Sequence, residues 1–135
     1  MNSEQMYAEI ILDYYRNPKN KGNLNNPKIS ARDTNPLCGD VIEIYGNLDE
    51  NLIKEIKFNG KGCIISQASA SILTESVLNK NIEELKDFSK DDLLNLLGIN
   101  VSPARLKCAL LPLKVLKLAI YRYMGEKLEE NGYER

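Results

Sequence analysis

The apolar positions at the start of the chain recur every three or four residues, which is the spacing of one face of an α-helix. The stretch from Ser3 to Tyr15 has this pattern, with Ser3 suited to cap its N-terminus and Asn17-Pro18 suited to end it. The pattern predicts an amphipathic first helix. Its apolar stripe is expected to consist of Met6, Tyr7, Ile10, Ile11, Tyr14 and Tyr15.

A polar stretch rich in Asn, Lys, Gly and Pro follows from residue 18 to residue 35, and it predicts an irregular surface segment. A short β-branched strand is predicted at Val41–Tyr45, and a second strand at Leu52–Phe58. A turn-forming Asp-Glu-Asn lies between them, so the two predict an antiparallel hairpin. Ala31–Thr34 is expected to add a third strand. In a hairpin the start of one strand lies beside the end of its partner, so residues before 41 and after 58 are expected to meet.

The second half of the chain has helical spacing throughout. The expected helices are Ile65–Asn79, a short acidic turn at 83–88, Leu93–Leu97 and a last helix that begins at Ser102-Pro103. Ser89 to Asp92 resembles a capping box and Gly98 is a stop signal. The last helix is expected to bury Leu106, Ala109, Leu110, Leu113, Leu116, Ile120 and Met124.

Pro112 lies inside the last helix and has no N–H to donate to the Cys108 carbonyl, so we expect the helix to loosen or kink there. With no internal repeat, residues 1–135 are expected to form one α+β domain. Its core is a small three-stranded antiparallel sheet packed against several helices.

Composition excludes several classes of protein. Hydrophobic residues make up 43% of the 135 residues and charged residues 27%, as in ordinary globular domains. The formal net charge of −1 gives no electrostatic case for nucleic acid or an anionic membrane as partner. The first residues lack the pattern of a secretory signal, and no apolar run is long enough to span a bilayer. A cytoplasmic location is therefore expected.

The chain has three cysteines and no histidine. The absence of histidine excludes Ser-His-Asp and Cys-His catalysis and every zinc motif that contains histidine. Cys38 precedes Gly39, whereas Cys63 follows Gly62 at the start of an expected helix. A thiol at a helix N-terminus lies in a positive field that favours the thiolate.

Cys38, Cys63 and Cys108 form a candidate four-ligand set with Asp40, which consists of three thiolates and one carboxylate. Zinc, iron or a small iron–sulfur cluster accepts such a set. The spacing alone is weak evidence, because the chain has no C-x-x-C pair and free cysteines are commonly buried as core residues. Three core cysteines therefore remain the alternative interpretation at this point.

Four segments of the chain closely resemble the IscU/SufU/NifU N-terminal family of iron–sulfur cluster assembly proteins. They are Ile-Leu-Asp-Tyr-Tyr-Arg-Asn-Pro at 11–18, Asn-Pro-Leu-Cys-Gly-Asp at 35–40, Gly-Lys-Gly-Cys-Ile-Ile-Ser at 60–66 and Pro-Ala-Arg-Leu-Lys-Cys-Ala at 103–109. The resemblance covers nearly the whole chain, and it is closest to the SufU-like branch around the last cysteine. It implies a SufE/NifU-like α+β fold.

The resemblance also implies the site. The family's metal ligands match Cys38, Asp40, Cys63 and Cys108, with Cys38 as the candidate persulfide acceptor. Supporting roles are expected for Gly39, Gly62, Arg105 and Lys107. The cofactor is expected to be zinc or an iron–sulfur cluster, with Zn²⁺ as the metal in the isolated protein. The expected partners are a cysteine desulfurase of the SufS, IscS or NifS type, and recipient apo-proteins or other iron–sulfur carriers.

Three functions are consistent with this resemblance. The first is a scaffold that accepts persulfide sulfur and assembles or transfers a labile cluster. The second is a zinc-dependent sulfurtransferase of the SufU type, and the third is an interaction module in which zinc is only structural. Lys107 stands where IscU-type proteins carry histidine and favours the second function. The stretch from Cys63 to Cys108 is too short for the full insertion of SufU-type members and favours the first.

Overall fold

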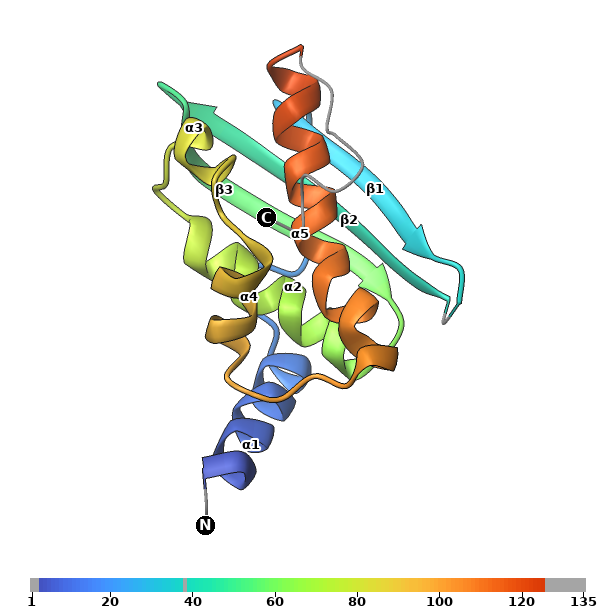
Figure 1. Cartoon of the computed structure of the whole chain (residues 1–135). Coiled ribbons are helices and arrows are strands. Elements are labelled where there is room, and N and C mark those ends of the chain that lie inside the picture. Colours follow the sequence, from blue (N-terminus) through green and yellow to red (C-terminus); the bar gives the residue numbers. More distant parts are fainter. Residues whose placement is uncertain (1–2, 38, 126–135) are drawn as a thin grey trace.

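Three strands and five helices make up the part of the chain that the computed structural model describes, residues 3–37 and 39–125 (Figure 1). In chain order they are α1 (Ser3–Arg16), β1 (Ile29–Asn35), β2 (Asp40–Asp49), β3 (Leu52–Lys61), α2 (Ile64–Val77), α3 (Ile82–Leu85), α4 (Lys90–Leu97) and α5 (Pro103–Tyr123). The expected α+β class, with a three-stranded antiparallel sheet packed against helices, is confirmed.

The sheet is an antiparallel meander in the order β1-β2-β3. Asn35 at the end of β1 pairs with Asp40 at the start of β2, and Val41 pairs with Lys61 at the end of β3. The strands are longer than β propensity predicts. β2 continues to Asp49 although Gly46 and Asn47 are poor β formers, because Gly46 pairs with both neighbouring strands and Asn47 pairs with β3.

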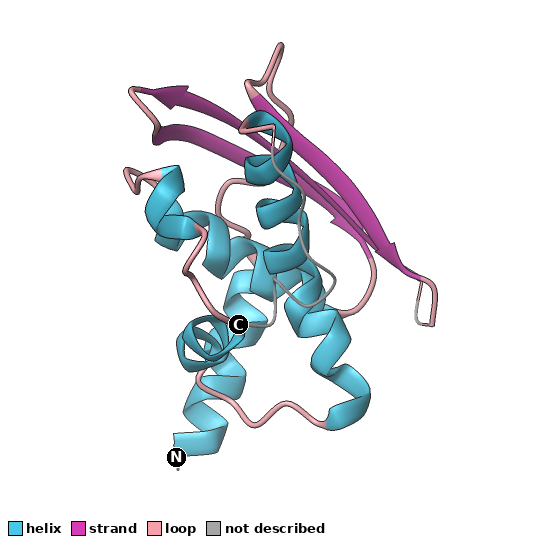
Figure 2. Cartoon of the chain, turned by 45° about the horizontal axis from the view of Figure 1, so that its top comes forward, coloured by secondary structure: helices cyan, strands magenta, loops and turns pink. Residues whose placement is uncertain are grey.

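The helices lie on one side of the sheet, and α2 and α5 pack against its face (Figure 2). Along β2 the residues alternate between buried and partly exposed, and Ile42 and Ile44 point into the core. α5 crosses this face and packs against β1, β2 and α2. It is buried on most of its circumference because it lies between the sheet and the other helices. Among the described residues, none of the helices has the length and apolar character needed to cross a membrane.

The first helix buries less than its sequence pattern predicts. Ile11 is in the core and Tyr14 is partly buried against it, whereas Met6, Ile10 and Tyr15 are 40–48% exposed. The predicted apolar stripe of α1 is thus only partly buried. The reason is that α1 packs mainly against one element, α2, which covers only a narrow strip of its surface. The side chain of Tyr7 lies outside the described part of the structure.

The expected interruption at Pro112 does not break the last helix, because α5 is continuous from Pro103 to Tyr123. One turn before the proline, the hydroxyl of Ser69 in α2 donates a hydrogen bond to the carbonyl of Ala109 at 2.7 Å. This buried bond satisfies a carbonyl in the region where proline weakens the helical ladder. It also fixes α2 against the part of α5 that carries Cys108.

The polar segment before β1 is more than a solvated connector. Its residues 20–22 run along the outer edge of β3, where Phe58 accepts a backbone bond from Gly22 and donates one to Asn20. The bonds cover an edge that would otherwise expose unpaired backbone groups.

In the second half of the chain, the predicted capping box is confirmed, since Ser89 and Asp92 bond reciprocally and Gly98 ends α4 in the left-handed conformation.

An ion pair joins α5 to the edge strand β1. The ammonium of Lys114 lies 2.7 Å from a carboxylate oxygen of Asp33, and both side chains are partly exposed. Burial alone would raise the pKa of Asp33, but the bonds from Lys114 and from the Thr34 N–H hold the pKa of this carboxyl below its ordinary value.

We therefore predict that Asp33→Asn lowers the free energy of unfolding at pH 7 by about 0.5 kcal/mol, as expected for a partly exposed pair. A lowered carboxyl pKa stabilises the fold above the unfolded-state value of about 4, and this contribution disappears as pH falls through the lower, folded-state value. The difference between wild type and variant should thus shrink below about pH 4. Urea unfolding at several pH values measures it, and a difference that stays constant with pH would contradict the ionic explanation.

Candidate metal centre

The sheet register places a carboxylate beside the first cysteine of α2. Asp40 is the first residue of β2 and is fully buried. One of its oxygens accepts the backbone N–H of Cys63 at 2.8 Å, and the other lies 3.8 Å from the Cys63 sulfur. The two residues meet because the start of β2 lies beside the end of β3, as the hairpin predicts.

Gly62 makes this close approach possible. A Cβ atom at this position would lie 2.0 Å from the Asp40 carboxylate oxygen, which is well inside van der Waals contact. Gly62 also has a φ of +137°, which side chains rarely adopt. Any residue other than glycine would therefore have to displace Asp40.

Cys63 caps the N-terminus of α2. Its sulfur accepts a hydrogen bond from the backbone N–H of Ser66 at 3.5 Å, and the Ser66 hydroxyl donates to the Cys63 carbonyl. The sulfur thus lies in the positive field of the free N–H groups at the start of the helix. Cys63 is partly exposed, so it can be reached from solvent.

Cys108 completes the group from the other side. It lies on α5, is 1% exposed, and its sulfur is 3.7 Å from the side-chain nitrogen of Asn35. The ligand atoms of Asp40, Cys63 and Cys108 all lie within 4.8 Å of one another. Two sulfurs and one oxygen at this separation suit Zn²⁺ or iron, and a cation would offset the cost of burying a carboxylate and a thiolate together.

Cys38, the remaining predicted ligand and the candidate persulfide acceptor, lies outside the described residues. Its two neighbours in the β1–β2 connection are described. Leu37 donates its N–H to the Asn35 side chain at 3.2 Å, and Gly39 donates its N–H to the Asn35 carbonyl at 2.8 Å. Gly39 has a φ of +72°, the left-handed conformation that a tight turn requires here.

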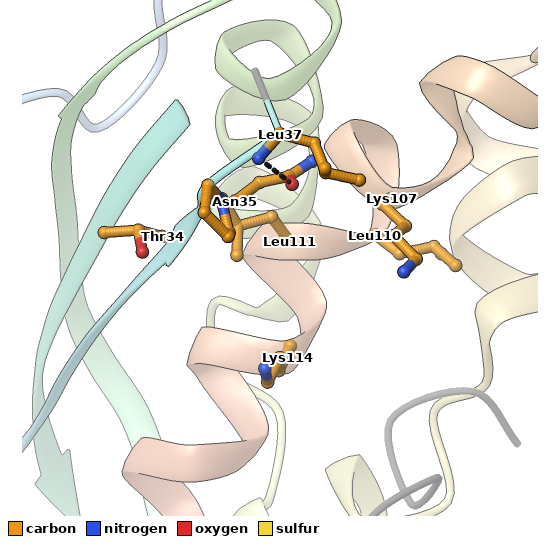
Figure 3. Close-up of a pocket in the computed structure, with 8 residues that line it drawn as sticks. Thr34, Asn35, Leu37, Lys107, Leu110, Leu111 and Lys114 are labelled. Carbon is orange, nitrogen blue, oxygen red and sulfur yellow. Dashed lines mark hydrogen bonds between the residues drawn. The ribbon is translucent and has the colours of Figure 1, made fainter. Parts of the chain in front are cut away.

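The two predicted basic residues lie at the start of α5, and both are exposed. Lys107 lines a cavity of about 190 Å³ between this helix and the end of β1, whereas Arg105 does not (Figure 3). Lys114 lies on the same wall, and Leu37, which is 84% exposed, lies at the cysteine-bearing loop. The cavity therefore combines apolar and basic side chains beside the candidate metal ligands.

Sequence reasoning did not identify Asn35, Ser66 or Lys114. Asn35 begins the segment that contains Cys38 and Asp40, but an asparagine before proline indicates only a turn. The spacing of Ser66 after Cys63 is the signal of a capped helix start, so this contact was accessible from the sequence. Lys114 has no local signal, because its position beside the site depends on how α5 crosses the sheet.

Comparison with known proteins identifies the family. Residues 6–130 match the NifU-like N terminal domain, and the chain belongs to this family. It is 37% identical to the zinc-dependent sulfurtransferase SufU of Bacillus subtilis, over 92% of this chain and 95% of SufU. It is 35% identical to the iron–sulfur cluster assembly scaffold protein IscU of Thermotoga maritima, over 87% of this chain and 94% of IscU.

A solved structure has the same fold. It is an iron–sulfur cluster assembly scaffold protein for the SUF system from Fervidobacterium islandicum, which is 30% identical and superposes with a TM-score of 0.75 over 88% of this chain and 99% of that one. The expected membership of the IscU/SufU/NifU group is thus confirmed. The alignment with SufU spans 141 positions, more than the 135 residues of this chain, so part of SufU has no counterpart here.

The geometry predicts that Gly62→Ala disrupts the centre by displacing Asp40. We expect metal affinity to fall by roughly ten- to a hundredfold, as when a group that orients a ligand is lost. Binding of Co²⁺, followed by its thiolate absorption, measures the effect.

Gly125→Ala is the matched control, since Gly125 also has a positive φ of +72° but a Cβ atom there would contact nothing within 4 Å. This variant should lose some stability from backbone strain and bind Co²⁺ as the wild type does. Equal Co²⁺ binding by Gly62→Ala and wild type would contradict the proposed role of Gly62.

Proposed function

We propose that this protein accepts persulfide sulfur from a cysteine desulfurase and assembles or transfers a labile iron–sulfur cluster. The observation that carries the proposal is the convergence of the Asp40, Cys63 and Cys108 ligand atoms within 4.8 Å, at the loop that contains Cys38. The relatives support the proposal, because one is named a zinc-dependent sulfurtransferase and the other an iron–sulfur cluster assembly scaffold protein. The cluster is the cargo of this protein rather than a permanent cofactor.

The four ligands have different roles in this proposal. Cys63 and Cys108 hold the metal from α2 and α5, while Asp40 supplies the weakest ligand because oxygen binds these metals less firmly than thiolate does. Cys38 is the acceptor of sulfur. Its thiolate attacks the outer sulfur of the desulfurase persulfide, the S–S bond breaks, and the desulfurase cysteine leaves as a thiolate. Cys38 then carries the persulfide, and no oxidant is consumed. Conversion of this sulfur to cluster sulfide takes two electrons per sulfur, which an external reductant such as a thiol or a reduced ferredoxin would supply.

A zinc-dependent sulfurtransferase is the second candidate. It is favoured by Lys107 beside Cys108 and by the identity with SufU. In this case Zn²⁺ would be bound in the isolated protein, and Cys38 would leave the ligand set when the desulfurase supplies a replacement ligand. The part of SufU that has no counterpart here counts against this candidate. A purely structural zinc site would use the same ligands without any sulfur transfer.

The cavity beside the site suits the desulfurase as a partner. Leu37 offers an exposed apolar contact, and Lys107 and Lys114 carry the positive charges on the cavity wall, one of them paired with Asp33. Arg105 adds a further exposed charge on the same helix. Apo-proteins or other iron–sulfur carriers would then receive the product. Free thiols that act in this way require a reducing compartment, which supports the cytoplasm as the location.

Metal analysis of protein purified without oxygen, combined with desulfurase turnover, separates the candidates. If the protein is a scaffold, protein purified without oxygen should contain iron and acid-labile sulfide that can be transferred to an apo-ferredoxin, in place of the Zn²⁺ expected in the isolated protein. Stoichiometric zinc together with strong stimulation of the desulfurase would instead support the sulfurtransferase, and zinc without either activity would support a structural site. A Cys38→Ala variant that keeps full activity in both assays would contradict the proposed site.

We also predict that Asp40→Ala makes a bound cluster more persistent, because an incoming thiolate then has no weak oxygen ligand to displace. Transfer to the apo-ferredoxin should slow by about tenfold, which corresponds to about 1.4 kcal/mol in the barrier. Asp49→Ala, at the exposed opposite end of β2, is the control and should transfer at the wild-type rate. An unchanged transfer rate in Asp40→Ala would count against this role of the carboxylate.

A further inference from the structure

Asn35 contacts the candidate metal centre but is not one of its candidate ligands. It is the last residue of β1 and is 8% exposed. Both ends of its side-chain amide are used. The nitrogen donates to the Cys108 sulfur at 3.7 Å, and the oxygen accepts the Leu37 N–H at 3.2 Å, a bond that Figure 3 shows. Its main-chain carbonyl accepts the Gly39 N–H. Asn35 therefore connects both sides of the Cys38 loop to a sulfur that lies 73 residues further along the chain.

The environment of Cys108 makes this donor important. Cys108 is almost completely buried, and a buried thiolate is costly unless hydrogen-bond donors or a cation face it. Cys63 takes its donor from the backbone of Ser66, at the N-terminus of a helix. Cys108 is in the interior of α5, where backbone N–H groups serve the helical ladder, so the amide of Asn35 is a donor that the helix itself does not supply.

We propose that Asn35 is a positioning residue for the metal centre: its amide donates to the Cys108 thiolate and keeps this ligand in register with the loop that carries Cys38. The inference rests on the proposed function, because it assumes that Cys108 binds metal as a thiolate. An N–H donor withdraws charge from a thiolate, so the Cys108 sulfur becomes a firmly placed and less electron-rich ligand. Sulfur arrival at Cys38 can then proceed while Cys108 stays in place.

The competing explanation is that Asn35 is only a turn residue, which holds Leu37 and Gly39 and affects the metal indirectly. Two variants separate the explanations. Asn35→Asp keeps the oxygen that accepts the Leu37 N–H but loses the donor to sulfur. Asn35→Ala loses both.

Asn47→Asp is a matched control at the opposite end of the sheet. The Asn47 side chain has the same pattern of bonds, since its oxygen accepts the Lys28 N–H at 3.1 Å and its nitrogen donates to Glu55 at 3.3 Å. This substitution makes the same chemical change and leaves the site untouched.

The experiment uses the full chain loaded with Co²⁺, whose thiolate-to-metal charge-transfer band reports the electron density on the sulfur. Both Asn35→Asp and Asn35→Ala should move this band to lower energy, while Asn47→Asp keeps the wild-type band. The zinc affinity of Asn35→Ala, measured by chelator competition, should fall by about tenfold. Circular dichroism of the metal-free variants tests whether they are folded. If Asn35→Asp fails to fold, a wild-type band in Asn35→Ala alone still overturns the inference.

A wild-type band in both Asn35 variants would overturn the inference, and so would a shift confined to Asn35→Ala, because that result assigns the effect to the turn. Failure of the proposed function would look different. In that case the wild type itself would show no thiolate charge-transfer band with Co²⁺, and the metal centre would be rejected along with the role of Asn35.

Discussion

The hydrogen bond between the Cys63 N–H and the Asp40 carboxylate holds the two halves of the site together. It joins the start of β2 to the start of α2, and it forms only because Gly62 has no side chain at the point where the carboxylate lies. The bond also directs the N-terminus of α2 at the buried carboxylate. The N-terminus is the end of a helix at which negative charge is favourable. The direction of α2 and the register of the sheet are therefore coupled through one contact.

The site places a carboxyl group and a cysteine sulfur where little solvent is present. Asp40 is fully buried and Cys108 nearly so, and each has a nearby N–H donor, from Cys63 in one case and from Asn35 in the other. If both groups are ionised, such donors reduce the cost of burying two anions close together without removing it. A bound cation removes most of the remaining cost, so metal binding and the stability of this end of the fold are expected to be linked.

Whether a contact of the fold or the site could be predicted from the sequence depends on how far apart its two residues lie in the chain. The hairpin alternation and the Gly62-Cys63 pair are local signals, and together they predict that Asp40 and Cys63 meet. The contact between Asn35 and Cys108 joins residues 73 apart and depends on the angle at which α5 crosses the sheet, so no local pattern encodes it. The partial exposure of the apolar stripe of α1 has the same origin, because the periodicity of Met6, Ile10 and Ile11 does not tell how many partners cover the helix.

The segment that runs along β3 covers one of the two edges of the sheet. Residues 20–22 occupy the outer edge of β3, so in the described part of the chain β1 is the edge strand without a neighbour on its outer side. A strand from another protein that extended this sheet would have to pair with β1. It would then end or begin beside Asn35, within one residue of the loop that carries Pro36 and Leu37. Sheet extension and access to the cysteine loop would thus occur on the same side of the molecule.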